Sequence, residues 1–322
     1  MKKRILSGIQ PTGDVHLGNY FGMMKPAIEL QDEGETFLFI ADLHALTSSI
    51  SPDELRKNTF NVALDFLSCG LDPQKTVFFK QSDVPEVTEL TWILSCQTSI
   101  GLLERCHSYK DKISKGMIPN HGLFAYPVLM AADILIYKSN FVPVGKDQKQ
   151  HLEVTRDIAM RFNNRYGEIL VIPEPIIREQ SAVVPGIDGQ KMSKSYQNTI
   201  PLFADEKEIK KKIMSIVTDS KGLNDPKNPD ECIPYQLYKL FASESQSNEM
   251  ANKLKTGGYG YGHAKKELFE IFWEHFKPFR EKRSEFLKNP DIVFKILRKG
   301  AEKARTEAQK NICEIRKAIG LN

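Results

Sequence analysis

Short apolar runs alternate with helical segments over the first 80 residues, and this alternation constrains the fold more than any other feature of the chain. Residues 4–9, 36–41 and 76–80 predict buried strands, and residues 19–30 have a helical pattern. A second helix is predicted after Ser51, because Ser51 is a good N-cap, Pro52 takes the first helical position and Glu54 lies three residues after the cap. Strands that alternate with helices form a parallel sheet with right-handed crossovers. We therefore expect an α/β fold with a doubly wound, Rossmann-like parallel sheet.

The second part of the chain has a different pattern. Strand-like runs end at about residue 172, with the last two at 141–144 and 169–172. The following segments all have helical, charge-rich patterns: 206–217, 234–243, 264–288 and 290–319. At 322 residues the chain is long enough for two domains. We expect a Rossmann-like domain over 1–199 with a helical insertion, an α-helical domain over 200–299, and a C-terminal helix over 300–322 that could pack on either.

Charge is distributed unevenly between these parts. The chain has a net charge of +4, but residues 1–190 carry −4 and residues 191–322 carry +8. A basic helical half favours a polyanionic partner such as RNA or DNA. Solvated helix faces would give the same charge count, so this alternative stays open.

The cysteines and the apolar segments indicate the cellular setting. The five cysteines contain no C-x-x-C pair, which argues against a disulfide framework or a zinc ribbon. The basic N-terminus lacks the apolar core of a signal peptide. The longest apolar stretch, residues 124–137, is interrupted by Asp133 and is shorter than the roughly 20 residues of a membrane span. We expect a cytoplasmic protein.

A loop with the sequence PTGDVHLGN, residues 11–19, joins the first predicted strand to the first predicted helix. Backbone N–H groups of such a glycine-containing loop and of the helix N-terminus can approach a phosphate. The His16 imidazole adds a possible donor to a phosphoryl oxygen. The motif alone is also compatible with a purely structural loop.

A second loop, KMSKS at residues 191–195, follows the glycine-containing segment PGIDG at 185–189. Two lysines three residues apart can stabilise the negative charge that develops on a polyphosphate. The glycines would let the loop close on its ligand. A solvated basic loop is the simpler alternative.

Together these motifs make the sequence resemble the class I aminoacyl-tRNA synthetases and, more narrowly, the bacterial tryptophanyl-tRNA synthetase family. The matching segments follow the family's order and spacing along most of the chain: SGIQPTG at 7–13, HLGNYFG at 16–22, YPVLMAADIL at 126–135, VPVGKDQKQH at 142–151 and KMSKS at 191–195. Asn19 stands where the family's HIGH motif often has a second histidine.

The resemblance implies a reaction, its substrates and its partners. Tryptophan and ATP would give tryptophanyl-AMP and pyrophosphate, with Mg²⁺ on the phosphates, and the acyl group would pass to the 2′-hydroxyl of the terminal adenosine of tRNA(Trp). The expected assembly is a homodimer in which residues 1–199 form the catalytic domain and residues 200–299 bind the anticodon. Residues 200–322 contain only Cys232 and Cys313 among cysteines, so we expect no iron–sulfur cluster of the kind some relatives bind.

The resemblance also assigns site residues. Catalytic roles fall to His16, Asn19, Lys191 and Lys194. ATP binding is implied for Gln10, Pro11, Thr12, Gly18, Asn19, Gly145, Lys146, Asp147, Val184, Lys191, Met192, Ser193, Lys194 and Ser195. Tryptophan binding is implied for Gly8, Gln10, His44, Tyr126, Met130, Asp133, Val142, Val144 and Gln148. No metal ligands among the side chains are expected.

One face of a predicted helix fits this ligand on chemical grounds as well. Tyr126, Met130 and Asp133 lie at i, i+4 and i+7, and therefore on one side of the helix. A carboxylate in such an apolar run needs a donor, which could be the indole N–H of tryptophan or a nearby Arg or Lys. Given the resemblance, we favour Asp133 as the acceptor of the indole N–H. His44, at the end of a strand, could line the pocket or be structural.

Other functions remain open at this point. A tyrosyl-tRNA synthetase shares the fold and both signature motifs, and a small-molecule nucleotidyltransferase also uses a histidine-containing loop. A catalytically silent RNA-binding paralogue is disfavoured because His16, Lys191 and Lys194 are all present. The glycine-rich run 257–262 has no strand before it, so we interpret it as a turn between helices and not as a nucleotide loop.

Overall fold

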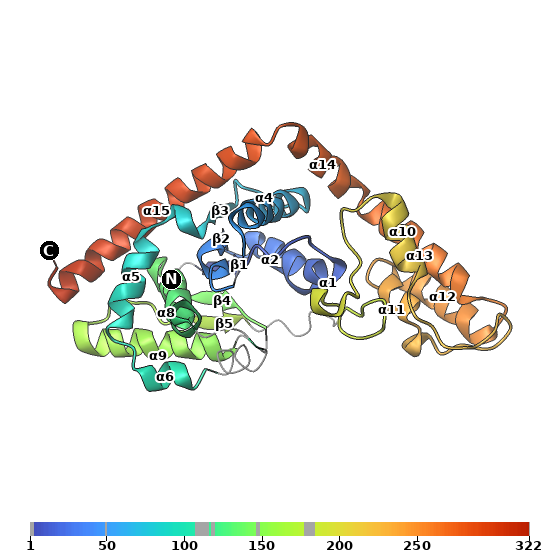
Figure 1. Ribbon diagram of the computed structural model, residues 1–322, viewed down its shortest axis with the longest axis horizontal. Coiled ribbons are helices and arrows are strands. Elements are labelled where there is room, and N and C mark those ends of the chain that lie inside the picture. Colours follow the sequence, from blue (N-terminus) through green and yellow to red (C-terminus); the bar gives the residue numbers. More distant parts are fainter. Residues whose placement is uncertain are drawn as a thin grey trace. The chain divides into compact units, whose positions relative to one another are not determined.

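The computed structural model describes residues 3–48, 50–106, 116, 120–145, 149–176 and 184–321. The chain divides into two compact units (Figure 1). The first unit comprises Met1–Gly13, Ala27–Glu179 and Asn289–Asn322, and the second comprises Asp14–Pro26 and Gln180–Lys288. Each unit is therefore assembled from segments that are distant in the sequence.

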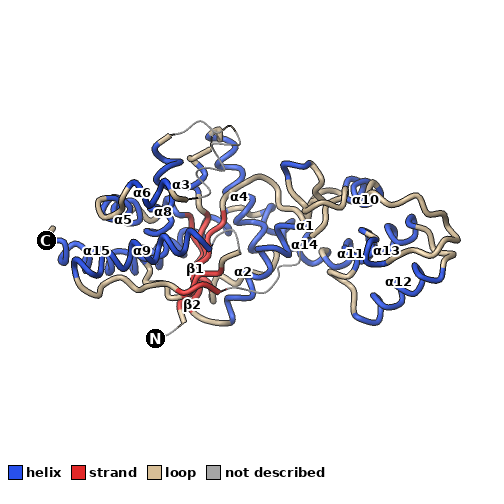
Figure 2. Tube along the Cα trace, turned by 90° about the horizontal axis from the view of Figure 1, so that it is seen from below, coloured by secondary structure: helices blue, strands red, loops and turns tan. Residues whose placement is uncertain are grey.

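A five-stranded parallel sheet forms the centre of the first unit. The strands are β1 (Arg4–Ile9), β2 (Glu35–Ile40), β3 (Thr76–Lys80), β4 (Phe141–Pro143) and β5 (Glu174–Ile176), in the order β3-β2-β1-β4-β5. All neighbouring pairs are parallel, and helices flank the strands on both sides (Figure 2). The order turns back at β1, between β2 and β4, which is the topology of a doubly wound α/β fold. The expected fold class is confirmed.

The last strand does not lie where the sequence predicted it. The apolar run 169–172 is outside the sheet, and β5 begins at Glu174 instead. Asn163 explains the difference, because its Oδ1 accepts hydrogen bonds from the backbone N–H groups of Ile169 and Leu170. Its Nδ2 also donates to the Leu170 carbonyl. These backbone groups are bonded to a helix side chain and not to the neighbouring strand.

The helices of the first unit include α3 (Asp42–Ala45), α4 (Pro52–Ser68), α5 (Glu86–Ser95), α6 (Ile100–Glu104), α8 (His121–Ile136), α9 (Lys149–Tyr166) and α15 (Asp291–Ile319). The predicted start of α4 is confirmed, because the Ser51 hydroxyl accepts a hydrogen bond from the backbone N–H of Glu54. The C-terminal helix α15 packs against β3 and α5. Gly300 permits close contact with β3, since a Cβ built there would lie 1.8 Å from the carbonyl oxygen of Phe78.

The second unit is helical over its described part. Its helices include α1 (Leu17–Asn19), α10 (Glu206–Met214), α11 (Ile233–Tyr238), α12 (Glu244–Thr256), α13 (Tyr261–His275) and α14 (Lys277–Lys288). A π-helical segment covers Tyr20–Met24, and α2 (Lys25–Glu29) continues from it into the first unit. The sequence did not predict α12, and the single helix expected over 264–288 is two helices that meet at Phe276. The turn expected at 257–262 is confirmed: Gly257 and Gly258 have φ values of 78° and 76° between α12 and α13.

A cluster of aromatic rings forms part of the core of the second unit. Tyr20 and Phe21, directly after α1, contact rings from α11, α13 and α14 or their ends: Phe241, His275, Phe276 and Phe279. The cluster attaches the segment that follows His16 to the helices near residue 275.

Neither cross-links nor membrane spans are found in the described residues. Cys69, Cys96, Cys106, Cys232 and Cys313 form no disulfide. In the part of the chain that the structure describes, no helix combines the length and the apolar character needed to cross a membrane.

Candidate active site

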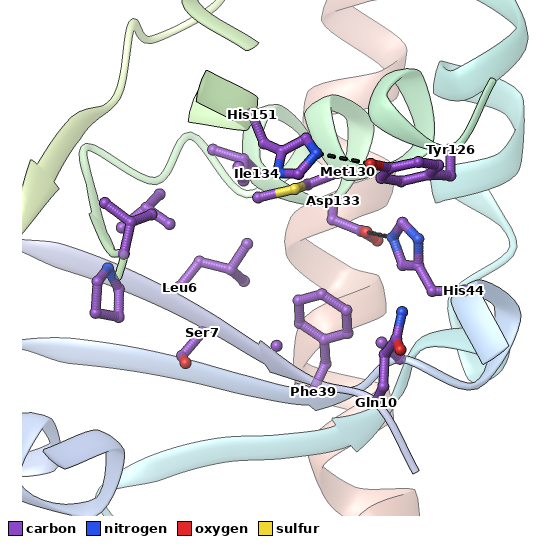
Figure 3. Close-up of a pocket in the computed structure, with 15 residues that line it drawn as sticks. Leu6, Ser7, Gln10, Phe39, His44, Tyr126, Met130, Asp133, Ile134 and His151 are labelled. Atoms are coloured by element: carbon purple, nitrogen blue, oxygen red, sulfur yellow. Dashed lines mark hydrogen bonds and ion pairs between the residues drawn. The ribbon is translucent and has the colours of Figure 1, made fainter. Parts of the chain in front are cut away.

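A cavity of about 410 Å³ opens in the first unit, where β1, β2 and β4 meet α8 (Figure 3). It lies beyond the carboxyl ends of parallel strands at the reversal of strand order, the place where open α/β sheets bind ligands. The cavity is lined by Leu6, Ser7, Gly8, Gln10, Phe39, Ala41, His44, Tyr126, Met130, Asp133, Ile134, Val142, Pro143, Val144 and His151. Most of these side chains are apolar, so the cavity suits a largely apolar ligand that makes a few directed polar contacts.

The structure brings most of the predicted tryptophan-binding residues together. Gly8, Gln10, His44, Tyr126, Met130, Asp133, Val142 and Val144 all line the cavity, whereas Gln148 lies outside the described residues. The expected helix face is confirmed, because Tyr126, Met130 and Asp133 all point from α8 into the same space (Figure 3).

Seven lining residues are not among those predicted to bind tryptophan: Leu6, Ser7, Phe39, Ala41, Ile134, Pro143 and His151. Phe39 of β2 packs over Gly8, where an added Cβ would lie 2.5 Å from the Phe39 ring. The alternation of β2 could have identified Phe39 as one of the residues on that face. His151, at the start of α9, shares a hydrogen bond of 2.7 Å with the Tyr126 hydroxyl, which holds the phenol at the cavity wall (Figure 3).

Asp133 is the buried carboxylate of the cavity. It is 2% exposed, and its hydrogen-bond partners among the described residues are His44 and Gln81, in place of the Arg or Lys of the structural alternative. His44 Nε2 donates to Oδ2 at 2.8 Å, and Gln81 Nε2 lies 2.8 Å from Oδ1 and 2.9 Å from Oδ2. Burial raises the pKa of the Asp133 carboxyl, while the hydrogen bonds from His44 and Gln81 favour its ionised form. His44 thus lines the cavity and also supports Asp133.

The second unit contains the KMSKS loop and the part of the first signature loop from Asp14 onward. His16 is the N-cap of α1: its Nδ1 accepts from the backbone N–H of Asn19, and the Asn19 Oδ1 accepts from the backbone N–H of His16, each at 3.3 Å. This reciprocal pair is a capping box. The Asn19 side chain therefore has a structural role, because it binds the backbone N–H of His16, while the Asn19 backbone N–H orients the His16 ring.

The KMSKS loop contacts the His16 loop directly. The backbone N–H of Gly18 donates to the sulfur of Met192 at 3.3 Å, and the backbone N–H of Leu17 donates to the Ile200 carbonyl at 2.9 Å. Met192 is buried, whereas Lys191, Lys194 and Ser195 are exposed. The loop thus buries one apolar side chain against the first motif and leaves its two lysines in solvent.

Asn198, which the sequence reasoning did not select, organises the KMSKS loop. Its Oδ1 accepts from the backbone N–H of Ser193 at 2.7 Å, and its Nδ2 donates to Asp188 at 2.8 Å and to the Lys191 carbonyl at 3.2 Å. The side chain is 1% exposed, so these bonds are shielded from water. One buried amide therefore fixes the backbone on either side of Met192.

The remaining predicted ATP residues are spread over the chain. Gln10, Pro11 and Thr12 follow β1, and Gly145 follows β4 at two residues beyond its end. Val184 is buried, and its carbonyl accepts from the backbone N–H of Met192 at 2.9 Å. Lys146 and Asp147 lie outside the described residues.

Burial and the nearby Lys194 ammonium lower the pKa of His16 to about 4. The imidazole is therefore neutral at pH 7. Because Nδ1 accepts the Asn19 N–H, the proton of the neutral ring is on Nε2, which can donate a hydrogen bond to an anion. His16 thus provides an oriented donor, and the lysines of the KMSKS loop provide the positive charge.

The lowered pKa of His16 predicts a pH-dependent stability. Unfolded His16 binds a proton near pH 6.5 and the folded form only near pH 4, so stability falls as the pH drops through this window. Between pH 7 and pH 5 the loss from this residue should be about 2 kcal/mol. Urea unfolding at pH 7 and pH 5 measures the loss. Between these pH values, the free energy of unfolding should fall by about 2 kcal/mol less in His16→Gln than in the wild-type protein. An identical pH dependence in both proteins would contradict the pKa assignment.

Comparison with known proteins agrees with these features. The family model described as "tRNA synthetases class I (W and Y)" matches residues 1–277. The chain belongs to this family of class I aminoacyl-tRNA synthetases.

Individual relatives place the chain within the family. A tryptophan–tRNA ligase of Fusobacterium nucleatum is 57% identical over 320 residues, covering 99% of this chain and 98% of the relative. The crystal structure of tryptophanyl-tRNA synthetase from Campylobacter jejuni in complex with ADP and tryptophan is 53% identical, with a TM-score of 0.95 over 99% of this chain and 100% of that one. The tryptophanyl-tRNA synthetase of Mycoplasma pneumoniae is 32% identical with a TM-score of 0.83, over 100% of this chain and 99% of that one. Within the family, the chain groups with the bacterial tryptophanyl-tRNA synthetases.

Proposed function

We propose that this protein is the ligase that joins tryptophan to tRNA(Trp). The reaction activates L-tryptophan with ATP to tryptophanyl-AMP and pyrophosphate, and then transfers the acyl group to the 2′-hydroxyl of the terminal adenosine. The observation that carries the proposal is the cavity of the first unit, which is mostly apolar and holds the buried carboxylate of Asp133. The 53–57% identity to tryptophan–tRNA ligases over nearly the whole chain supports it.

The indole ring of tryptophan fits the character of this cavity. Leu6, Phe39 and Val142 offer apolar contacts to a flat ring, and Met130 adds a polarisable sulfur. Asp133 would accept the indole N–H, which is the ring's only donor. Gln10 and Gln148 would position the amino acid group. A buried acceptor left without a partner is costly, so analogues without the N–H should bind poorly.

The chemistry of activation requires no general base, because the tryptophan carboxylate is already ionised at neutral pH. We assign catalysis to positioning and to charge stabilisation. The Nε2–H of neutral His16 would donate to a phosphate oxygen, with Asn19 holding the ring in place. Lys191 and Lys194 would neutralise the charge that develops on the leaving pyrophosphate. Both lysines are exposed and so are accessible to a phosphate ligand.

We assign the rest of ATP to residues of both signature loops and of the strand ends. The triphosphate would contact Pro11, Thr12, Gly18, Met192, Ser193 and Ser195, and the adenosine part would contact Gln10, Gly145, Lys146, Asp147 and Val184. The described residues include no group of three or more His, Cys, Asp or Glu side chains that could hold a metal ion. N–H and ammonium groups suit phosphate oxygens and not Mg²⁺, so Mg²⁺ would arrive on the ATP phosphates, where it neutralises part of their charge.

The tRNA would use the basic second part of the chain. Residues 191–322 carry a net charge of +8, which favours the binding of phosphates. We therefore assign anticodon binding to residues 200–299 and catalysis to residues 1–199, with residues 300–322 as a C-terminal helix against the sheet. The cytoplasm is the compartment in which such an enzyme would meet its tRNA.

We also propose a homodimer. The two most exposed large apolar side chains of the described residues, Trp92 at 72% and Ile100 at 67%, lie on the consecutive helices α5 and α6. Large exposed apolar patches mark protein–protein interaction surfaces, and we place the dimer contact at these two helices. Sedimentation should give twice the monomer mass for the wild-type protein, and Trp92→Asp should shift the equilibrium toward monomers. A monomeric wild-type protein at micromolar concentration would contradict the proposal.

The test of the proposed function is ATP–pyrophosphate exchange with each standard amino acid in turn. Tryptophan alone should support exchange, and charging of tRNA(Trp) should follow. Exchange driven by tyrosine would instead identify a tyrosyl-tRNA synthetase. No exchange with any amino acid, in protein shown to be folded, would favour a nucleotidyltransferase acting on a small molecule.

A further inference from the structure

Gln81 lies behind the cavity and joins three of its supporting elements. It follows β3 directly, is 1% exposed, and is absent from the cavity lining. Its Oε1 accepts from the backbone N–H groups of Leu43 and His44, in α3, at 3.1 and 3.3 Å. Its Nε2 contacts both carboxylate oxygens of Asp133, in α8, at 2.8 and 2.9 Å. A single buried amide thus connects the sheet, α3 and α8.

The two ends of this amide cannot be exchanged. Backbone N–H groups are donors only, so the oxygen of Gln81 must face Leu43 and His44. The nitrogen must then face Asp133, where its N–H groups meet an acceptor. The backbone of α3 therefore determines that Asp133 meets a donor at this position.

We propose that Gln81 is a specificity-determining positioning residue that fixes the Asp133 carboxylate so that one acceptor site faces the ligand. The proposal rests on the proposed function. It assigns to Gln81 a role in selecting amino acids whose ring carries an N–H group. A carboxylate has about four lone-pair sites. Within the described part of the chain, two contacts from Gln81 and one from His44 occupy three of them. The site left for a ligand is on Oδ1.

The charges around Asp133 show why a neutral donor is needed at this position. His44 and Asp42 face the carboxylate from α3, and the buried Tyr137 hydroxyl interacts with it electrostatically from the end of α8. Asp42 disfavours a second negative charge nearby, and burial does the same. Gln81 adds two hydrogen-bond contacts that favour the ionised carboxylate without adding charge. Without them, Asp133 would more readily be protonated and rotate, and a protonated acid offers a donor where the indole requires an acceptor.

The test compares tryptophan with benzothienylalanine, in which sulfur replaces the indole N–H. The measured quantity is the ratio of kcat/KM for the two amino acids in ATP–pyrophosphate exchange. Gln81→Met keeps approximately the same shape but removes the amide. We expect it to reduce the ratio by about tenfold or more, through a higher KM for tryptophan and a nearly unchanged kcat/KM for the analogue.

Gln31→Met is the matched control. Gln31 also uses both ends of its amide, because its Oε1 accepts from the Asp72 N–H and its Nε2 donates to the Gly70 carbonyl, but it is not among the residues that line the cavity. A general loss of packing would lower kcat/KM for both amino acids equally in either variant. A folded Gln81→Met protein with the wild-type ratio, or an equal loss of the ratio in Gln31→Met, would overturn the proposal.

Gln81→Glu provides a second test that does not depend on how Gln81→Met folds. The new carboxyl can still accept from Leu43 and His44, but it must share a proton with Asp133 to replace the lost donor. Selectivity for tryptophan should therefore be retained near pH 6 and fall by pH 9, more steeply than in the wild-type protein. The same pH profile in both proteins would overturn the inference. A wild-type protein that does not use tryptophan in this assay would overturn the proposed function itself, and the inference with it.

Discussion

Gly300→Ala should destabilise the first unit by about 3 kcal/mol, which is at the upper end of the range for overpacking. The added Cβ would lie 1.8 Å from the carbonyl oxygen of Phe78 and 2.6 Å from its carbon. Both are backbone atoms of β3, so no side-chain rotation can make room. α15 would have to move away from the sheet, and the buried residues beside Gly300 that belong to the same core, such as Ala301 and Ala304, would lose packing.

Urea unfolding monitored by circular dichroism measures this effect. The control is Gly101→Ala in α6, where the nearest atom to an added Cβ is the end of the flexible Arg105 side chain at 3.7 Å. That variant should be neutral or more stable by up to about 1 kcal/mol, because alanine is the better helix former. If Gly300→Ala unfolds at the wild-type urea concentration, α15 does not pack on β3 as described.

Asp133→Asn should lower kcat/KM for tryptophan by about 100-fold or more. The substitution hardly changes the shape, but it replaces one acceptor oxygen by an NH₂ donor. The donors of His44 and Gln81 already face this side chain at 2.8 Å, so the new NH₂ meets another donor in either orientation or turns toward the ligand. In each case the indole N–H loses its acceptor or the new amide leaves a buried donor without a partner.

Exchange kinetics and calorimetric titration with tryptophan both measure this loss. Asp42→Asn is the control, because Asp42 is also a buried carboxylate but bonds to the backbone N–H and hydroxyl of Ser82 and does not line the cavity. Its effect on kcat/KM should be less than about tenfold. If Asp133→Asn retains the wild-type affinity for tryptophan, the indole N–H is bound elsewhere.

The clearest signals in the sequence were local ones. Alternation of apolar runs with helical patterns predicted the parallel sheet, and the Ser51–Glu54 pattern predicted the start of α4. Helical spacing placed Tyr126, Met130 and Asp133 on one face, which the cavity confirms. Each of these inferences uses residues close together in the chain, where backbone geometry fixes the relation between neighbours.

The failures have a different cause. The run 169–172 is apolar enough for a strand, but Asn163 binds its backbone outside the sheet. Nothing in the local pattern around Gln81 shows that it contacts Asp133, which is 52 residues away in the sequence. The partners of Asn198 are only five to ten residues away, but they lie in a loop, where no helix or strand period determines which groups meet.

The sequence by itself thus determined the α/β class, the signature loops at His16 and at Lys191–Ser195, and the residues that share one face of α8. Only the tertiary structure showed three other features: the donors that hold Asp133, the close approach of α15 to β3, and the neutral state of His16 at pH 7. Periodicity and capping depend on neighbours in the chain and can be read from it. Hydrogen-bond partners, close backbone contacts and burial depend on segments that only the complete fold brings together.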